Sequence, residues 1–237
     1  MVRCFVKTRR CFGRETSWLS ESDMILVRIA LSVTFLICLG AFAADENSSD
    51  SNFVYAELAS GSLDERIGVN SNVTTLKIGG QNLVRDHFYL AVDYSARFIH
   101  PQNTTTELYS LLPGIKFRYQ ALDELELGAG VKLGYLWAKQ TQDIDGANLY
   151  SENSVQWGGM AELRYRVSGK WELSVAGELK NSDTVDEHIF YLFSEYHVSP
   201  NVKLGIFYSH TNGDYNTAKI KGESTSNDGG LVVTYCF

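Results

Sequence analysis

The side chains best suited to chemistry gather in two stretches of this 237-residue chain. One residue separates Asp143 from Asp145, and one residue separates Asp186 from His188. Carboxylates that hold a water molecule beside a histidine base could hydrolyse a bond. Acidic residues are also common in solvated loops, so these four side chains would form a site only if the fold made them converge. The spacing is loose, and we predict that the protein is not an enzyme.

A second pair, Ser209 and His210, could supply a hydroxyl nucleophile and its base, which must lie within hydrogen-bonding reach. The surrounding pattern predicts a strand, in which neighbouring side chains point to opposite faces, so the two should diverge. The histidines show no metal-ligand spacing, and no glycine-rich phosphate loop opens a helix. We predict no catalytic residue, no metal and no cofactor.

Alternation of apolar and other residues is the dominant pattern of the chain. From Leu125 to Trp137 every second residue is apolar, and the residues between them are glycine or charged except for Leu136. Soluble strands usually have about 5–6 residues, whereas a tilted strand that crosses a bilayer needs about 9–11. The pattern predicts ten strands: 53–60, 73–83, 87–98, 108–120, 125–139, 154–167, 171–181, 188–198, 202–211 and 228–237. The first two have the weakest pattern, so a barrel of eight strands is the alternative.

The connections alternate between tight turns and longer loops, such as the polar segment 101–106. Backbone groups in a bilayer must all be paired within the protein, so a membrane sheet has to close. We predict an all-β fold, a closed antiparallel up-and-down transmembrane β-barrel, rather than a soluble sandwich. Pro113 lacks an N–H group and is interpreted as a bulge.

In such a barrel the apolar face meets lipid and the other face lines the lumen. Small barrels are filled by side chains, so the charges should pair into a polar core; a narrow water path beside the inward glycines is the alternative. The predicted lumen charges are Asp93, Arg97, Lys116, Arg118, Glu126, Lys132, Glu162, Arg164, Arg166, Glu172, Glu178, Glu195 and Lys203.

Aromatic residues on the apolar face gather near the strand ends, as they do at the two interfaces of membrane barrels. A soluble core would place bulky rings in the middle of its strands. The predicted aromatic girdles consist of Phe88, Phe117, Tyr119, Tyr135, Trp137, Trp157, Tyr165, Trp171, Tyr196, Tyr208 and Tyr235.

The segment 24–43 combines an arginine, a short apolar core and a small-x-small end at Ala43. These are the parts of a secretory signal peptide, and the core is too short for the alternative, a membrane anchor. We predict an upstream extension from a wrongly chosen start over 1–23, a signal peptide over 24–43 and the barrel over 44–237. Cys236 is then the only cysteine of the mature chain, so no internal disulfide can form.

The last strand alternates Leu231, Val233 and Tyr235 and ends on Phe237. This resembles the terminal signal of Gram-negative outer-membrane proteins, which the barrel-assembly machinery recognises. Together with the leader and the hairpins, the chain resembles small outer-membrane β-barrels of the OmpA-like or porin-like kind. The resemblance implies export through the Sec pathway, residence in the bacterial outer membrane, and contact with outer-membrane lipid and lipopolysaccharide.

Two fainter resemblances define the alternative function, a barrel-embedded hydrolase. The aspartates and His188 are similar to the water-activating set of the omptin proteases, and Ser209 to Asn212 is similar to part of the lipid A deacylases. The net charge of −7 argues against a nucleic-acid partner. We therefore predict a structural or surface-interaction role, with a narrow pore for small solutes as its variant; the oligomeric state is unknown.

Overall fold

A computed structural model describes residues 52–63, 72–100, 103–216 and 221–237 of the chain. The predicted upstream extension and signal peptide lie outside these residues. Within the described ranges there is no helix with the length and apolarity to cross a membrane. The strands are β1 (Phe53–Leu63), β2 (Asn72–Arg85), β3 (Phe88–His100), β4 (Thr104–Leu122), β5 (Leu125–Gln142), β6 (Asn148–Arg166), β7 (Trp171–Ser182), β8 (Val185–Ser199), β9 (Val202–Asn216) and β10 (Lys221–Cys236).

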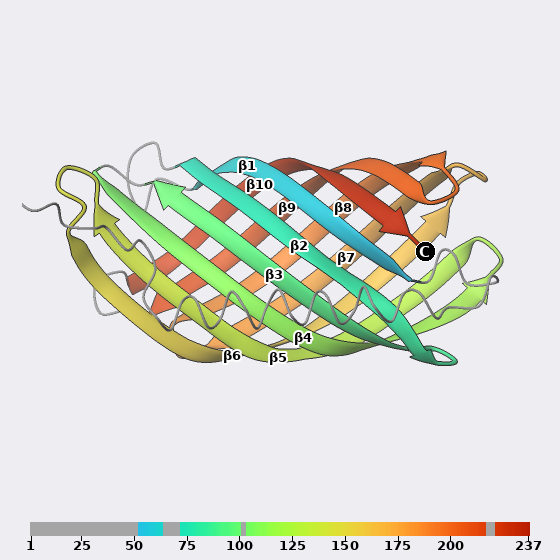
Figure 1. Ribbon diagram of the computed structural model, residues 1–237, viewed down its shortest axis with the longest axis horizontal. Helices are drawn as coiled ribbons and strands as arrows, with labels where there is room; N and C mark the ends of the chain where they lie inside the picture. Colours follow the sequence, from blue (N-terminus) through green and yellow to red (C-terminus); the bar gives the residue numbers. More distant parts are fainter. Residues whose placement is uncertain (1–51, 64–71, 101–102, 217–220) are drawn as a thin grey trace, which may run out of the picture.

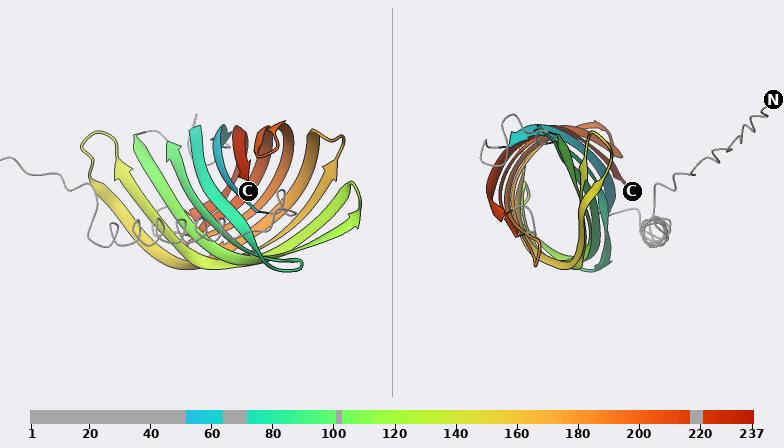
Figure 2. Two further views of the ribbon diagram at one scale, coloured as in Figure 1. Left: turned by 45° about the vertical axis from the view of Figure 1, so that its right-hand side comes forward. Right: turned by 90° about the vertical axis from the view of Figure 1, so that its left-hand side faces the viewer.

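The ten strands form a closed barrel in which every strand pairs antiparallel with its neighbours in sequence. Closure is made by β1 and β10, which pair from Phe53 opposite Cys236 to Leu63 opposite Ser226. Figure 1 shows the strands strongly tilted against the long axis, and the right-hand view of Figure 2 shows them closing into a ring. The predicted all-β, up-and-down barrel of ten strands is confirmed, and the alternative of eight strands is wrong because β1 and β2 both belong to the sheet.

The two ends of the barrel differ. Tight connections such as Asp86 and His87 between β2 and β3 lie at one end with the carboxy terminus, which we call the turn end. The opposite, loop end carries the longer connection between β5 and β6 (Figure 1). Asp86 has a φ of 46°, a left-handed conformation that an aspartate tolerates in a tight turn.

Several strands continue further toward the loop end than the sequence pattern predicts. β4 begins at Thr104, β6 at Asn148 and β10 at Lys221, so parts of the predicted loops are strand. Thr104 to Thr106, predicted as a surface loop, belong to β4, whereas 101–102 lie outside the described residues. The prediction failed there because these stretches lack the continuous apolar face on which the strand assignments relied.

The predicted bulge at Pro113 is also wrong. Pro113 lies opposite Val92 of β3, and the register with β5 is the same before and after it, since Leu111 pairs with Tyr135 and Gly114 with Lys132. A proline removes one donor from a ladder, but this does not require an extra residue in the strand. The register of β4 therefore runs straight through this position.

The outside of the barrel is apolar over a broad band. On β6, the outward side chains run from Val155 (55% exposed) to Tyr165 (45% exposed), ten steps further along the strand. Ten steps of about 3.3 Å cover about 33 Å of strand. At the roughly 40° tilt of membrane barrels this corresponds to a height of about 25 Å, the height of their apolar band. Other exposed members are Leu58, Ile78, Leu90, Ile115, Val131, Leu133, Leu163, Val175, Leu179, Leu192, Leu204, Ile206, Leu231 and Val233.

Candidate functional site

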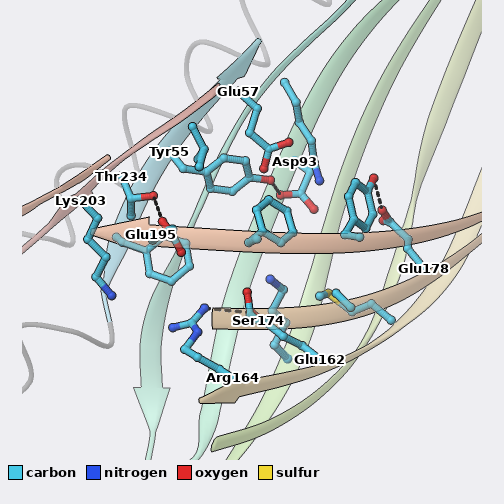
Figure 3. Close-up of a pocket in the computed structure, with 18 of the residues that line it drawn as sticks. Tyr55, Glu57, Asp93, Glu162, Arg164, Ser174, Glu178, Glu195, Lys203 and Thr234 are labelled. Carbon is cyan, nitrogen blue, oxygen red and sulfur yellow. Dashed lines mark hydrogen bonds and ion pairs between the residues drawn. The ribbon is translucent and has the colours of Figure 1, made fainter. Parts of the chain in front are cut away.

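The interior of the barrel holds most of its charges, and this charged interior is the candidate site. Figure 3 shows charged side chains from opposite walls meeting in a chamber. Arg166, predicted to face the lumen, is exposed near the turn end. Lys116, Glu126, Glu162, Arg164 and Glu195 are half-buried, and Asp93, Arg97, Arg118, Lys132, Glu172, Glu178 and Lys203 are buried.

Lys132 is the centre of one ionic network. Its Nζ lies 2.5 Å from Oδ2 of Asp93 on β3 and 2.6 Å from Oε1 of Glu178 on β7. The hydroxyl of Tyr55 donates to the other oxygen of Asp93, and that of Tyr191 donates to the other oxygen of Glu178 at 3.3 Å. One cation therefore satisfies two carboxylates from opposite walls, and two tyrosines complete their hydrogen bonding.

Arg164 is the centre of a second network, closer to the turn end. Its guanidinium lies 2.9 Å from Glu162 and 2.7 Å from Glu172. Glu172 also accepts a hydrogen bond from Nζ of Lys203 at 2.8 Å. Arg118 lies 3.1 Å from Glu126, so charged groups of β4, β5, β6, β7 and β9 are joined across this part of the bore.

A third network lies toward the loop end. Arg97 contacts Oε1 of Glu187 at 2.6 Å and donates to the hydroxyl of Ser226 at 2.7 Å. Lys180 lies 3.8 Å from Glu187 and 3.9 Å from Glu178, which links this network to that of Lys132. The interior is thus crossed by ionic contacts at three heights.

Five charged members of this interior were not predicted from the sequence: Glu57, Lys77, Lys180, Glu187 and Asp228. Glu57 and Lys77 lie opposite each other on β1 and β2, the two strands with the weakest pattern. Lys180 lies two residues beyond Glu178, so the alternation of β7 would have found it had it been continued. Glu187 was considered only as part of a loop, because the start of β8 at Val185 was placed too late.

Lys77 lies between two aromatic rings. Its Nζ is 5.6 Å from the ring centre of Tyr55 and 5.3 Å from that of Tyr191, distances that suit a cation–π contact. Glu57, Lys77 and Tyr191 line both of the interior cavities, one of about 90 Å³ toward the turn end and one of about 60 Å³ toward the loop end. Each has room for a few water molecules, and the three side chains form the boundary between them.

The loop end of the bore is filled by an apolar cluster, which we call the loop-end cap. Its buried members come from eight of the ten strands, so they meet across the bore. The smaller cavity lies directly against the cap, since Leu108, Leu136 and Val185 line both. The cap consists of Leu63, Val73, Ile99, Leu108, Leu136, Ala138, Tyr150, Val185 and Tyr215.

At the height of the cap, polar residues appear on the outer face of the wall and apolar residues on its inner face. Ala138 is 2% exposed inside the barrel, whereas its neighbour Lys139 faces outward. Buried Tyr215 likewise follows the exposed Asp214. Polar groups outside and apolar groups inside are the arrangement of a water-soluble protein. The strands therefore continue past the apolar band into a region whose outer surface is polar.

The predicted water-activating residues lie on separate hairpins. Asp143 accepts a hydrogen bond from the Thr105 hydroxyl at 2.8 Å, and Asp145 accepts one from the backbone of its own turn. Asp186 accepts one from the backbone N–H of Ser182, and His188 is exposed on the outer wall. The structure does not bring these four together, and in the described part of the chain no group of three or more His, Cys, Asp or Glu could hold a metal ion.

Ser209 and His210 point to opposite faces. Ser209 is buried in the lumen, and Nδ1 of His210 is 2.8 Å from the side-chain oxygen of Asn227 on the outside. Cys236 is fully buried at the end of β10.

The predicted girdle residues all lie on outward positions of their strands. Phe88 and Phe117 are neighbours across β3 and β4 with ring centres 5.3 Å apart, and Trp171 and Tyr196 are neighbours across β7 and β8 at 5.1 Å. Nine of the eleven are exposed by 40–56%, and Trp137 and Tyr196 are half-buried. Their contact with membrane interfaces stays a prediction.

The chain has the architecture of a closed, ten-stranded antiparallel β-barrel. Solved structures with a similar fold include Neisserial surface protein A (17% identity, TM-score 0.47, 78% of this chain and 97% of that chain). They also include Ail of Yersinia pestis (10%, 0.40, 78% and 98%) and the outer membrane protease OmpT of Escherichia coli (11%, 0.40, 79% and 97%). No protein-family model and no curated protein matches the sequence. These likenesses concern the barrel alone and assign no role.

Proposed function

We propose that this protein is an integral outer-membrane barrel with a sealed interior, which serves a structural and surface-contact role. The turn end faces the periplasm and the loop end faces outside, as in other outer-membrane barrels. Its partners are outer-membrane lipid and lipopolysaccharide, and the barrel-assembly machinery through the last strand. It reaches the membrane by Sec-dependent export.

The observation that carries this proposal is the loop-end cap. Its apolar side chains come from eight strands and meet across the bore, so a charged solute would have to give up hydration to pass them. Below the cap, the three ionic networks cross the bore and leave cavities of about 90 Å³ and 60 Å³, as expected for a barrel of about this strand number. This arrangement favours a filled scaffold over the narrow pore.

The test is ion conductance of the refolded protein in a planar bilayer, with a general porin as the positive control. We expect the porin to conduct and this protein to give no steady current. Insertion is checked separately by the slower migration of heated samples in gels and by outer-membrane fractionation. A steady current would contradict the sealed interior, and recovery in the soluble periplasm would contradict the membrane assignment.

A further inference from the structure

We propose that the outer wall of β4 to β8 carries a binding groove for one acyl chain of lipopolysaccharide, whose polar part lies at Asn181 and His188. This inference rests on the proposed membrane location and orientation. It adds a defined lipid site to a barrel wall that would otherwise contact lipid without preference.

The groove has a volume of about 530 Å³ and crosses five strands. Its floor follows one row of paired residues, in which Ile115 pairs with Val131, Val131 with Gly159, Gly159 with Leu179, and Leu179 with His188. All five side-chain positions lie on the outward face of their strands, so the groove opens to the surroundings of the barrel.

Gly159 creates the depression. A Cβ atom added there would meet only the backbone oxygen of Gly130, at 3.8 Å, so the space above it is open. Its paired neighbours on the two adjacent strands protrude, with Val131 66% and Leu179 54% exposed, and Trp157, 56% exposed, bounds it on the loop-end side. A missing side chain between bulky neighbours therefore leaves a trough in the apolar band.

The length of the trough suits one acyl chain. Five neighbouring strands at a spacing of about 4.8 Å cover about 19 Å. One leaflet of a hydrocarbon core about 30 Å thick measures about 15 Å. Because lipid tails are as apolar as the wall, affinity must come from close fit, which a trough provides and a smooth wall does not.

The polarity of the trough sets the direction of the lipid. The floor from Ile115 to Leu179 is apolar, whereas Asn181 and His188 at the β7–β8 end can hydrogen-bond to a headgroup. These two residues lie near the link between β7 and β8, at the loop end. In the proposed orientation that end is in the outer leaflet, which Gram-negative bacteria build from lipopolysaccharide.

The test compares two glycine substitutions in the full-length barrel. Gly159→Leu fills the trough. Gly177→Leu adds the same side chain on β7, where an added Cβ meets nothing within 4 Å but where the residue pairs with Ala161, outside the row that floors the trough. Each barrel is refolded with purified rough lipopolysaccharide, with phosphatidylethanolamine or with both, and the lipid retained in mild detergent is counted by native mass spectrometry.

We expect the wild type and Gly177→Leu to retain one lipopolysaccharide, and Gly159→Leu to retain at least tenfold less. Equal retention by all three barrels, or retention of phosphatidylethanolamine in preference, would overturn the proposal. Gel migration of heated and unheated samples reports folding separately: barrels that fold and insert without binding refute the groove alone, whereas failure of the wild type to insert refutes the proposed function as well.

Discussion

At position 132 a single ammonium group serves two buried carboxylates on opposite walls. Lys132 is 5% exposed, and Asp93 and Glu178 are buried with it. A buried ion pair contributes little net stability when complete, because desolvation offsets the attraction. Loss of one partner is costly, since the remaining charges stay buried without compensation.

Lys132→Met should therefore destabilise the barrel strongly, because methionine fills similar space but removes the ion pair of Asp93 and leaves Glu178 with only the longer contact to Lys180. We expect the free energy of unfolding to fall by about 3–5 kcal/mol, measured by urea denaturation in lipid vesicles. Lys170→Met, in the exposed turn between β6 and β7, is the control and should change it by less than about 0.5 kcal/mol. Equal effects of the two substitutions would show that the Lys132 network does not hold the walls together.

At the scale of the strands, the loop-end cap sets where the membrane part of the wall stops. Glu107 faces outward and Leu108 inward on β4, whereas Leu133 faces outward and Lys132 inward on β5. Along such a strand the outward side chains change from apolar to polar and the inward ones from polar to apolar. In the proposed membrane this change marks the passage from lipid into water. The region beyond the apolar band is held by ordinary burial of apolar side chains rather than by lipid.

The cap predicts a stability effect at Leu136, which is 3% exposed inside it. Leu136→Ala should leave a cavity and lower the free energy of unfolding by about 2–5 kcal/mol. Ile144→Ala is the control, because Ile144 is 79% exposed in the connection between β5 and β6 and should have little effect. Urea denaturation measures both, and a loss at Leu136 no larger than at Ile144 would refute a packed cap.

The sequence predicted the strands best where one face is continuously apolar. From Leu125 to Trp137 the alternation identified both the strand and its inward residues. It failed at the start of β4 and β10, where the residues on both faces are polar and a period of two no longer separates apolar from polar. The partners within the interior could not be predicted, because contacts such as Lys132 with Glu178 join strands that are not neighbours in the sheet.

At the scale of the whole molecule, closure of the barrel depends on the pairing between β1 and β10. The last strand pairs with β1 on one side and β9 on the other, so its loss would leave two open edges in the membrane. Leu231, Val233 and Tyr235 face outward on it, and the ring centres of Tyr235 and Phe237 are 6.3 Å apart at the turn end. The proposed assembly signal therefore consists of residues that also lie on the closing strand.

Recognition and closure can be separated by experiment. Tyr235→Ala combined with Phe237→Ala removes two rings but leaves the backbone pairing of β10, so refolding of purified protein into vesicles should match the wild type. In cells, the amount of folded barrel in the outer membrane should fall at least fivefold, measured by unheated gel migration. Phe88→Ala is the matched control, since it removes an equally exposed turn-end ring from β3. If both variants assemble alike in cells, the last strand serves closure alone, and the interpretation of its alternating end as an assembly signal is wrong.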